Sequence, residues 1–137
     1  MFRREITAKA VMDSLGTVIA FVESCLEELG VPPRAQVQLT MAVDELFTNI
    51  ASYAYPDRPG TATVRVETEE QPDAVVLTFL DGGIPYDPLT HADPDVTLSA
   101  EERPIGGLGI YMVKKTVDEI AYAYRDGQNV LTIRKYL

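Results

Sequence analysis

The sequence predicts an α+β fold, a two-layer α/β sandwich in which helices cover one face of a mixed, mostly antiparallel β-sheet. Two long helical patterns come early in the chain, and two strand-like runs follow them directly. Later, the turn dipeptide Asp126-Gly127 lies between the last two strand-like runs, which is a strong hairpin signal. Helices and strands that are grouped in this way favour an α+β sandwich.

The first half of the chain is expected to hold one strand and two helices. Residues 2–8 alternate loosely between apolar and polar types, which indicates a short strand. Apolar residues recur at helical spacing over 11–29, and Gly30 followed by Pro32 is typical of a helix end. A second helix is expected over 34–53, before a cluster of proline and glycine.

The second half is expected to supply most of the sheet. Strands are predicted at 62–68 and 74–80, and the second run is so continuously apolar that it indicates a central strand buried on both sides. Residues 81–104 contain several prolines and little periodicity, and loops of such length are commonly functional. The remaining expected elements are a helix over 108–117 and strands over 120–124 and 130–136.

Composition limits the classes of function. The 137 residues are expected to form a single domain over 1–137. Twelve basic and 21 acidic residues give a net charge of −9, which argues against nucleic-acid and anionic-membrane partners. No apolar run approaches a membrane span and no secretion signal is visible, so a cytoplasmic protein is expected. One His and one Cys argue against a zinc site and against Ser/His or Cys/His catalysis.

The first motif that could carry chemistry is the pair Glu45 and Asn49 in the second helix. Residues four apart project from one face of a helix, and this pair interrupts a largely apolar surface. Burying an unpaired carboxylate is unfavourable, so the pair indicates a function. The alternative is a partly exposed face on which the pair has no role.

Two glycine-containing motifs follow. Asp81-Gly82-Gly83 comes directly after the apolar strand, where a carboxylate can accept hydrogen bonds and the backbone can approach a ligand closely. An ordinary capped turn is the alternative. The run Gly106-Gly107-Leu108-Gly109-Ile110 opens the last predicted helix, where backbone N–H groups and the helix dipole favour an anion. A flexible hinge is the alternative there.

In this order, the three motifs resemble those of the ATPase superfamily of gyrase B, heat-shock chaperones, histidine kinases and MutL, which has the Bergerat, or histidine-kinase-like ATPase, fold. Within it the chain is most similar to the bacterial anti-sigma factor serine/threonine kinases. The Asp-x-Gly-x-Pro-Tyr-Asp-Pro run at 81–88 supports this closer resemblance. The similarity extends over nearly the whole chain.

The resemblance implies a role for each motif residue. Asn49 would coordinate Mg²⁺ on the nucleotide phosphates, and Glu45 would be the general base that takes a proton from the attacking hydroxyl. Asp81 would accept a hydrogen bond from the adenine amino group, and Gly83 would let the purine approach. Residues 82–106 would be the ATP lid.

Further nucleotide contacts are implied by the same resemblance. The phosphate loop would comprise Gly106, Gly107, Leu108, Gly109 and Ile110, and Thr132 on the last strand would lie near adenine. Arg103 and Lys114 are candidate phosphate contacts. Arg103 is displaced from the position next to the glycines that some relatives use, and for Lys114 the alternative is a solvated helix face.

The predicted lid region carries an unfavourable charge for ATP. Residues 81–104 hold six acidic residues and one arginine, a net charge of −5. This segment repels an anionic nucleotide, so binding should depend on Mg²⁺, backbone N–H groups and the helix dipole.

The implied function is an ATP- and Mg²⁺-dependent serine/threonine protein kinase that binds and phosphorylates an anti-anti-sigma (STAS-domain) protein. That partner would compete with a sigma factor or another client for this protein, and a homodimer is expected. The alternative is a non-catalytic, nucleotide-gated binding module of the same fold. A histidine-kinase module would need a helix with a phosphoacceptor His, and this chain has none.

Overall fold

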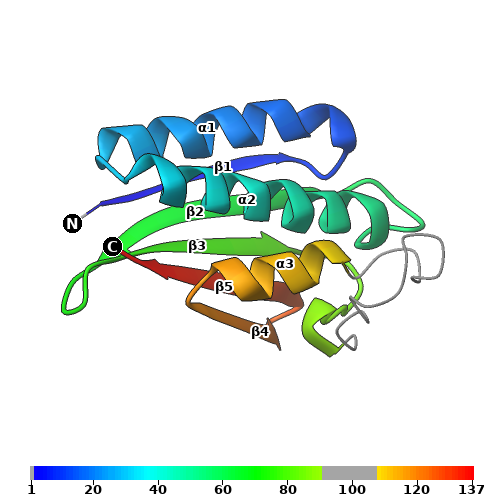
Figure 1. Ribbon diagram of the computed structural model, residues 1–137. Helices are drawn as coiled ribbons and strands as arrows, with labels where there is room; N and C mark the ends of the chain where they lie inside the picture. The colour runs from blue at the N-terminus through cyan, green and yellow to red at the C-terminus, as the bar shows by residue number, and fades with distance from the viewer. Residues whose placement is uncertain (1, 91–107) are drawn as a thin grey trace.

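The computed structural model describes residues 2–90 and 108–137 of the chain (Figure 1). Its strands are β1 (Arg3–Lys9), β2 (Thr61–Glu69), β3 (Ala74–Asp81), β4 (Glu119–Arg125) and β5 (Gln128–Tyr136). Its α-helices are α1 (Leu15–Glu28), α2 (Pro33–Tyr53) and α3 (Leu108–Thr116), and short 3₁₀ turns lie at η1 (Met12–Ser14) and η2 (Pro88–Thr90). Each helix and strand expected from the sequence is therefore present, with shifts at the ends.

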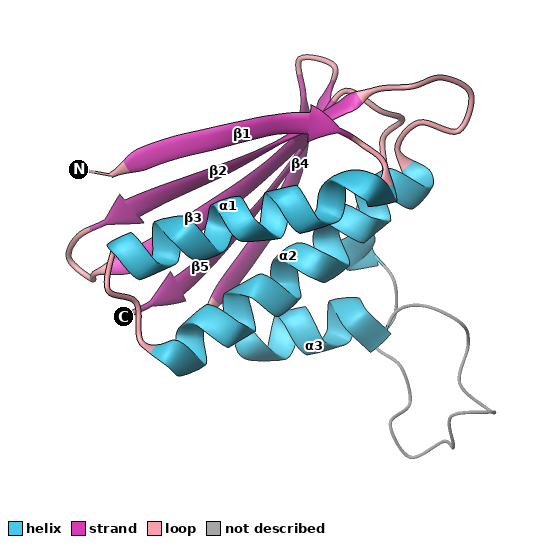
Figure 2. Cartoon of the chain, turned by 90° about the horizontal axis from the view of Figure 1, so that it is seen from above, coloured by secondary structure: helices cyan, strands magenta, loops and turns pink. Residues whose placement is uncertain are grey.

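The sheet is antiparallel, and the helices lie on one of its faces. The strand order is β1-β2-β3-β5-β4, and every described pairing is antiparallel. The predicted α+β sandwich is confirmed, although the described strands include no parallel pair that would make the sheet mixed. Figure 2 shows α1, α2 and α3 in one layer above the strands.

The core lies between these two layers. Alternate residues of β2 point inward and are buried, whereas helices α1 and α2 each contribute an apolar stripe. The largest fully buried side chains include Phe47 on α2, Phe79 on β3 and Leu26 on α1. Burial of each such side chain contributes on the order of 2 kcal/mol, so the stripe of α2 holds that helix firmly against the sheet. This packing fixes the direction in which its polar residues project.

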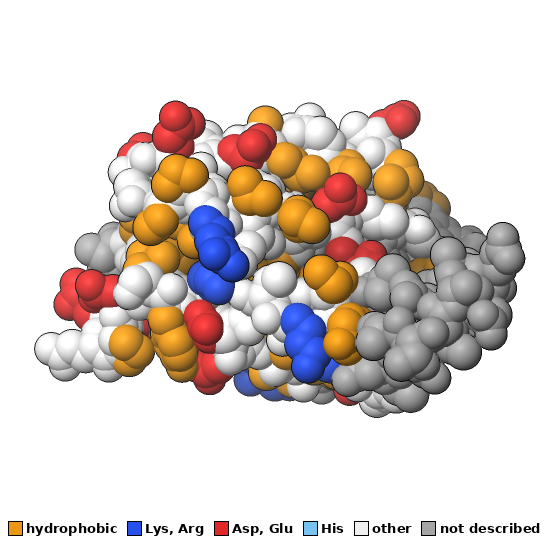
Figure 3. Space-filling view, in the orientation of Figure 1, with side chains coloured by type: hydrophobic (Ala, Val, Ile, Leu, Met, Phe, Trp, Pro, Cys, Tyr) orange, Lys and Arg blue, Asp and Glu red, His pale blue; other side chains and the backbone are white. Residues whose placement is uncertain are grey.

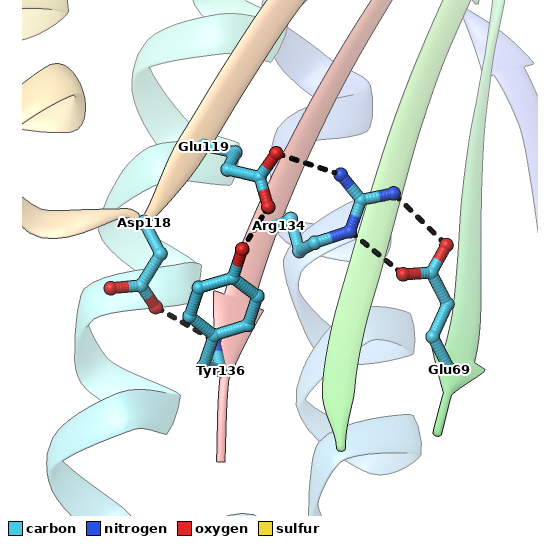
Figure 4. Close-up of polar contacts among 5 residues, drawn as sticks. All are labelled: Glu69, Asp118, Glu119, Arg134 and Tyr136. Atoms are coloured by element: carbon cyan, nitrogen blue, oxygen red, sulfur yellow. Dashed lines mark hydrogen bonds and ion pairs between the residues drawn. The ribbon is translucent and has the colours of Figure 1, made fainter. Parts of the chain in front are cut away.

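Strand β3 is buried on both faces, as its apolar sequence indicates, although helices cover only one face. On the other face Arg134 lies beside Val76 in the register and reaches across β3 to Glu69, with N–O distances of 2.8 and 2.9 Å. Arg134 also lies 3.4 Å from Glu119, which accepts a hydrogen bond from the Tyr136 hydroxyl (Figure 4). The stems of these long side chains shield the outer face of β3 from water.

The β4–β5 hairpin sets which residues of β5 face the helices. Asp126 and Gly127 have φ of 54° and 77°, the pair of positive values typical of a two-residue type I′ turn. The turn pairs Arg125 with Gln128, so alternate β5 residues from Asn129 onward point inward. Thr132 consequently lies on the outer face, paired with Thr78 of β3.

Candidate nucleotide site

A cavity lies where the C-terminal half of α2 meets the ends of β3 and β5, at the right-hand end of the molecule in Figure 1. The cavity and the open solvent at its mouth together occupy about 430 Å³. Most of its wall is apolar or aromatic, and three polar side chains interrupt it. The lining residues are Leu46, Asn49, Ile50, Ala54, Phe79, Asp81, Tyr86, Pro88, Tyr122, Asn129 and Leu131. An apolar cavity with few polar groups is typical of a site for a small organic ligand.

Asp81 is a buried carboxylate at the end of β3, and one of its oxygens is already in use. Its Oδ1 accepts hydrogen bonds from the backbone N–H of Gly83 and from Asn129 Nδ2, both at 2.9 Å. No described residue donates to Oδ2. Asp81 therefore retains one acceptor oxygen for a ligand in the cavity, as the sequence-based hypothesis requires for an amino group of a base.

Asn129 organises the polar end of the cavity. Its amide nitrogen donates to Asp81 and to the backbone oxygen of Ile84, at 2.9 and 2.8 Å. Its amide oxygen accepts the backbone N–H of Tyr86, at 3.0 Å, and the hydroxyl of Tyr122. Asn129 was not among the site residues expected from the sequence. The signal was present, because Asn129 is the one polar member of the inward-facing set that it forms with Leu131 and Ile133.

The structure does not bring Thr132 to the cavity. Leu131 lines the cavity and points to the helical side of the sheet. Thr132, one residue later, points to the opposite side because side chains alternate along a strand. The β5 residue that lines the cavity beside Asp81 is Asn129.

The loop after β3 is fastened to the end of α2. The backbone N–H of Ile84 donates to the backbone oxygen of Ala54 at 2.9 Å, and that of Gly82 donates to the Tyr55 hydroxyl at 2.8 Å. A Cβ on Gly83 would lie 2.2 Å from the backbone oxygen of Ala54, which cannot move aside. Glycine is therefore required at Gly83 for contact between this loop and α2, a reason independent of any purine.

Asn49 and Glu45 project from one face of α2, at the end of the cavity nearest α3. Asn49 lines the cavity, and Glu45 is half-buried one turn earlier. Neither side chain has a hydrogen bond or ion pair with a described residue. Burial, with a smaller contribution from the nearby carboxylate of Asp44, raises the pKa of Glu45. A raised pKa favours a carboxylate that can take up a proton.

Gly109 in the first turn of α3 lies directly against Glu45. A Cβ on Gly109 would be 1.8 Å from Glu45 Oε1 and 2.2 Å from its Cδ. The missing side chain thus makes the space that the Glu45 carboxylate occupies. Ile110, the next residue, is buried in the core and anchors this turn of α3.

The structure describes only some of the other predicted phosphate contacts. Gly106, Gly107, Arg103 and most of the predicted lid lie outside the described residues, as does the side chain of Leu108. Lys114 lies in the last turn of α3. It is six residues after the helix begins, or about 9 Å along the axis, so it is not at the helix N-terminus.

The residues present fit a purine nucleotide with Mg²⁺. The apolar walls suit a flat base, and the second oxygen of Asp81 suits an amino group on it. Mg²⁺ favours oxygen ligands and keeps several waters, so the Asn49 amide oxygen together with phosphates would suffice. Over residues 2–90 and 108–137, no cluster of acidic, His and Cys side chains could hold a metal ion by itself.

Comparison with known proteins agrees with this geometry. Residues 8–135 match the histidine kinase-like ATPase domain. The serine/threonine-protein kinase BtrW of Bordetella bronchiseptica is 30% identical over 104 residues, covering 75% of this chain and 72% of BtrW. The serine-protein kinases RsbW of Bacillus mycoides and Bacillus cereus strain B4264 are 27% and 28% identical over 103 residues. Those matches cover 72% of this chain and 62% of each RsbW protein. No helix in the described part of the chain has the length and apolarity needed to cross a bilayer.

Proposed function

Because the chain belongs to the histidine kinase-like ATPase domain family, we propose that it is an ATP- and Mg²⁺-dependent serine/threonine protein kinase whose substrate is a STAS-domain partner. Nucleotide binding is the property that the domain itself implies. The observation that carries the kinase assignment is the position of Glu45, a half-buried carboxylate without a partner among the described residues, one turn from Asn49 at the edge of the cavity. The names of BtrW and RsbW support the same reaction class.

Each residue of the site has a role in this proposal. ATP with Mg²⁺ supplies the phosphoryl group. Asp81 and Asn129 hold the polar end of the cavity in shape, and Asn49 would hold the metal ion on the nucleotide phosphates. Glu45 takes the proton from a serine or threonine hydroxyl while that oxygen forms a bond to the γ-phosphorus and the bond from this phosphorus to ADP breaks. The products are ADP and a phosphorylated partner.

A transfer assay with a matched control tests the proposal. The chain is incubated with γ-labelled ATP and STAS-domain proteins of the same organism, as wild type, Glu45→Gln and Glu23→Gln. Glu23 is an exposed glutamate of α1, so its variant should match wild type. Glu45→Gln should retain ATP affinity and lose on the order of 10²–10⁴-fold in transfer rate, the usual contribution of a general base.

The outcomes separate the kinase from its alternative. Label on a serine or threonine of the partner, lost with Glu45→Gln, supports the kinase. Tight ATP binding with no transfer to any STAS-domain protein would instead support a nucleotide-gated binding module.

The proposal extends to partner switching between a STAS-domain protein and a sigma factor, on a homodimeric kinase. The resemblance of the three motifs to those of the anti-sigma factor serine/threonine kinases motivates the extension, and the kinase names of BtrW and RsbW agree with it. Competition binding with purified sigma factors should show displacement by the unphosphorylated STAS-domain protein and none by its phosphorylated form. Light scattering should give twice the 15.1 kDa mass of one chain. A monomer at micromolar concentration would contradict the dimer.

A further inference from the structure

A second hollow, the α2–α3 groove, lies between these two helices toward the N-terminal end of α2. The groove and the open solvent at its mouth together occupy about 620 Å³. The α2 wall consists of Gln38, Met41, Ala42 and Glu45, which follow the i, i+3, i+4, i+7 spacing of one helix face. The groove is thus distinct from the nucleotide cavity, which is lined by α2 residues from Leu46 onward.

The α3 wall has the same spacing. It consists of Gly109, Met112, Val113 and Thr116. Figure 1 shows α2 and α3 side by side and running in opposite directions, so Gly109 lies opposite Glu45 and the groove leads away from that carboxylate. Between its polar ends the groove is lined by apolar side chains.

Two methionines at the mouth of the groove are exposed. Met41 is 59% exposed and Met112 is 45% exposed. Figure 3 shows that hydrophobic side chains reach the surface on the face that carries these helices. Exposed methionines are adaptable contact groups for a partner, because the side chain is flexible and polarisable. The groove therefore has the composition of a docking site for an apolar side chain.

Glu45 connects the groove to the nucleotide cavity. Asn49 and the cavity lie one turn beyond Glu45 along α2, whereas Met41 and the groove lie one turn before it. In phosphoryl transfer the attacking and leaving oxygens lie roughly in line, so the acceptor must approach from the side away from ADP. An acceptor that reaches Glu45 from outside the nucleotide cavity would cross this groove.

We propose that the α2–α3 groove binds the phosphoacceptor segment of the protein substrate, in an extended conformation, with an apolar side chain against Met41 and Met112 and the serine or threonine hydroxyl at Glu45. This inference rests on the proposed kinase function. Among the described residues, the groove lining contains one carboxylate, Glu45, and no basic side chain, so it favours an acceptor segment that is not acidic.

The spacing on α2 predicts the sequence of that segment. Glu45 is four positions after Met41 on α2, or about 6 Å along the helix axis. Two residues of an extended segment span about 6.6 Å, and their side chains point the same way. The apolar residue of the substrate is therefore expected two positions from the phosphorylated serine or threonine.

Substitution of both methionines by glutamine tests the groove. The variant Met41→Gln/Met112→Gln changes only exposed side chains, so it should fold. Its KM for the STAS-domain substrate should rise by about tenfold or more because apolar contact is lost. Its kcat and its ATP affinity should stay within about twofold of wild type. Met12→Gln is the matched control, because Met12 is 51% exposed on η1 and away from the groove, and it should change none of these values.

A complementary change is made in the substrate. Glutamine in place of the apolar residue two positions from the phosphorylated site should raise KM by a similar factor, with little further increase in the double methionine variant. An unchanged KM for that variant would overturn the inference and leave the kinase proposal intact. Conversion of a wild-type dimer to a monomer by the same variant would also overturn it, because the groove would then hold a second copy of the chain. If the wild type transfers no phosphoryl group, both the kinase proposal and the groove proposal are wrong.

Discussion

The contact between Gly109 and Glu45 predicts the effect of Gly109→Ala. The substitution removes the space that Glu45 occupies but keeps the backbone N–H that could contact a phosphate, so it separates these two roles of the glycine. Alanine at Gly109 would place its Cβ 1.8 Å from Glu45 Oε1, whereas an ordinary contact needs at least 3.4 Å. The carboxylate must therefore retreat by about 1.6 Å, the difference between these distances. A shift of that size in a reacting group lowers a rate by roughly 10²-fold. We expect Gly109→Ala to lower phosphoryl transfer by about this factor.

Stability and ATP binding should respond differently from transfer. The group that must move is the end of a flexible side chain, so folding should not suffer, and alanine can add up to about 1 kcal/mol of helix stability. The backbone N–H is retained in Gly109→Ala, so any phosphate contact made by that N–H is retained as well. Thermal unfolding and ATP titration should therefore stay near wild-type values while transfer falls.

Gly16→Ala is a matched control for this substitution. Gly16 is the second residue of α1, as Gly109 is of α3, and a Cβ there meets nothing within 4 Å. Gly16→Ala should leave the rate of phosphoryl transfer unchanged. Gly109→Ala should also cause little further loss in a Glu45→Gln background, because both changes act on one group. A wild-type transfer rate in Gly109→Ala would refute the proposed displacement of Glu45. A loss of ATP affinity as large as the loss of transfer would refute it as well.

Other predictions follow from the same site. Burial raises the pKa of Glu45, and a general base acts only when it is ionised. A pH–rate profile should therefore show the transfer rate rising at a pH above the usual pKa of a glutamate. A rise centred on the usual glutamate pKa would contradict the role of Glu45 as general base. The folded chain binds the Glu45 proton more tightly than the unfolded chain does. The free energy of unfolding should therefore fall as pH rises from the unfolded-state pKa through the folded-state pKa. Glu45→Gln should lessen this fall in melting temperatures measured against pH. Asn129→Ala should lower unfolding free energy by about 1–3 kcal/mol and weaken ATP binding, measured by denaturation and titration, and an unaffected affinity would count against its role. Gly83→Ala should destabilise the fold, because its Cβ meets immovable backbone, and an unchanged melting temperature would show that the loop can shift. Arg134→Leu should change stability by at most about 1 kcal/mol, as is usual for exposed ion pairs, and a larger drop would show that its network does more than shield β3.

The elements of the fold could be predicted from the sequence because each has a local cause. The apolar run at 74–80 indicated a central strand, and β3 is the middle strand of five. The first helix begins later than expected, at Leu15, because Met12–Ser14 form a 3₁₀ turn. Apolar spacing alone does not distinguish such a turn from the start of an α-helix.

The site could be predicted only where its residues lie on one local motif. Glu45 and Asn49 share a helix face, and Asp81 ends a strand, so their positions follow from short-range geometry. Thr132 does not line the cavity, because the direction of its side chain depends on the register of the β4–β5 hairpin, and a shift of one residue reverses the face. Asn129 was missed because its partners lie 43 to 48 residues away or across the hairpin.

The α+β class, the motif order that indicates a nucleotide site, and the acidic character of the chain all follow from the residues in order along the chain. Which side chains meet at that site follows from the packing of helices against the sheet. The tertiary structure placed Asn129 on Asp81, Gly109 against Glu45, and an apolar groove on the far side of that carboxylate. The two differ because periodicity and turn chemistry act over a few neighbouring residues, whereas a site forms from side chains that packing brings together from distant parts of the chain.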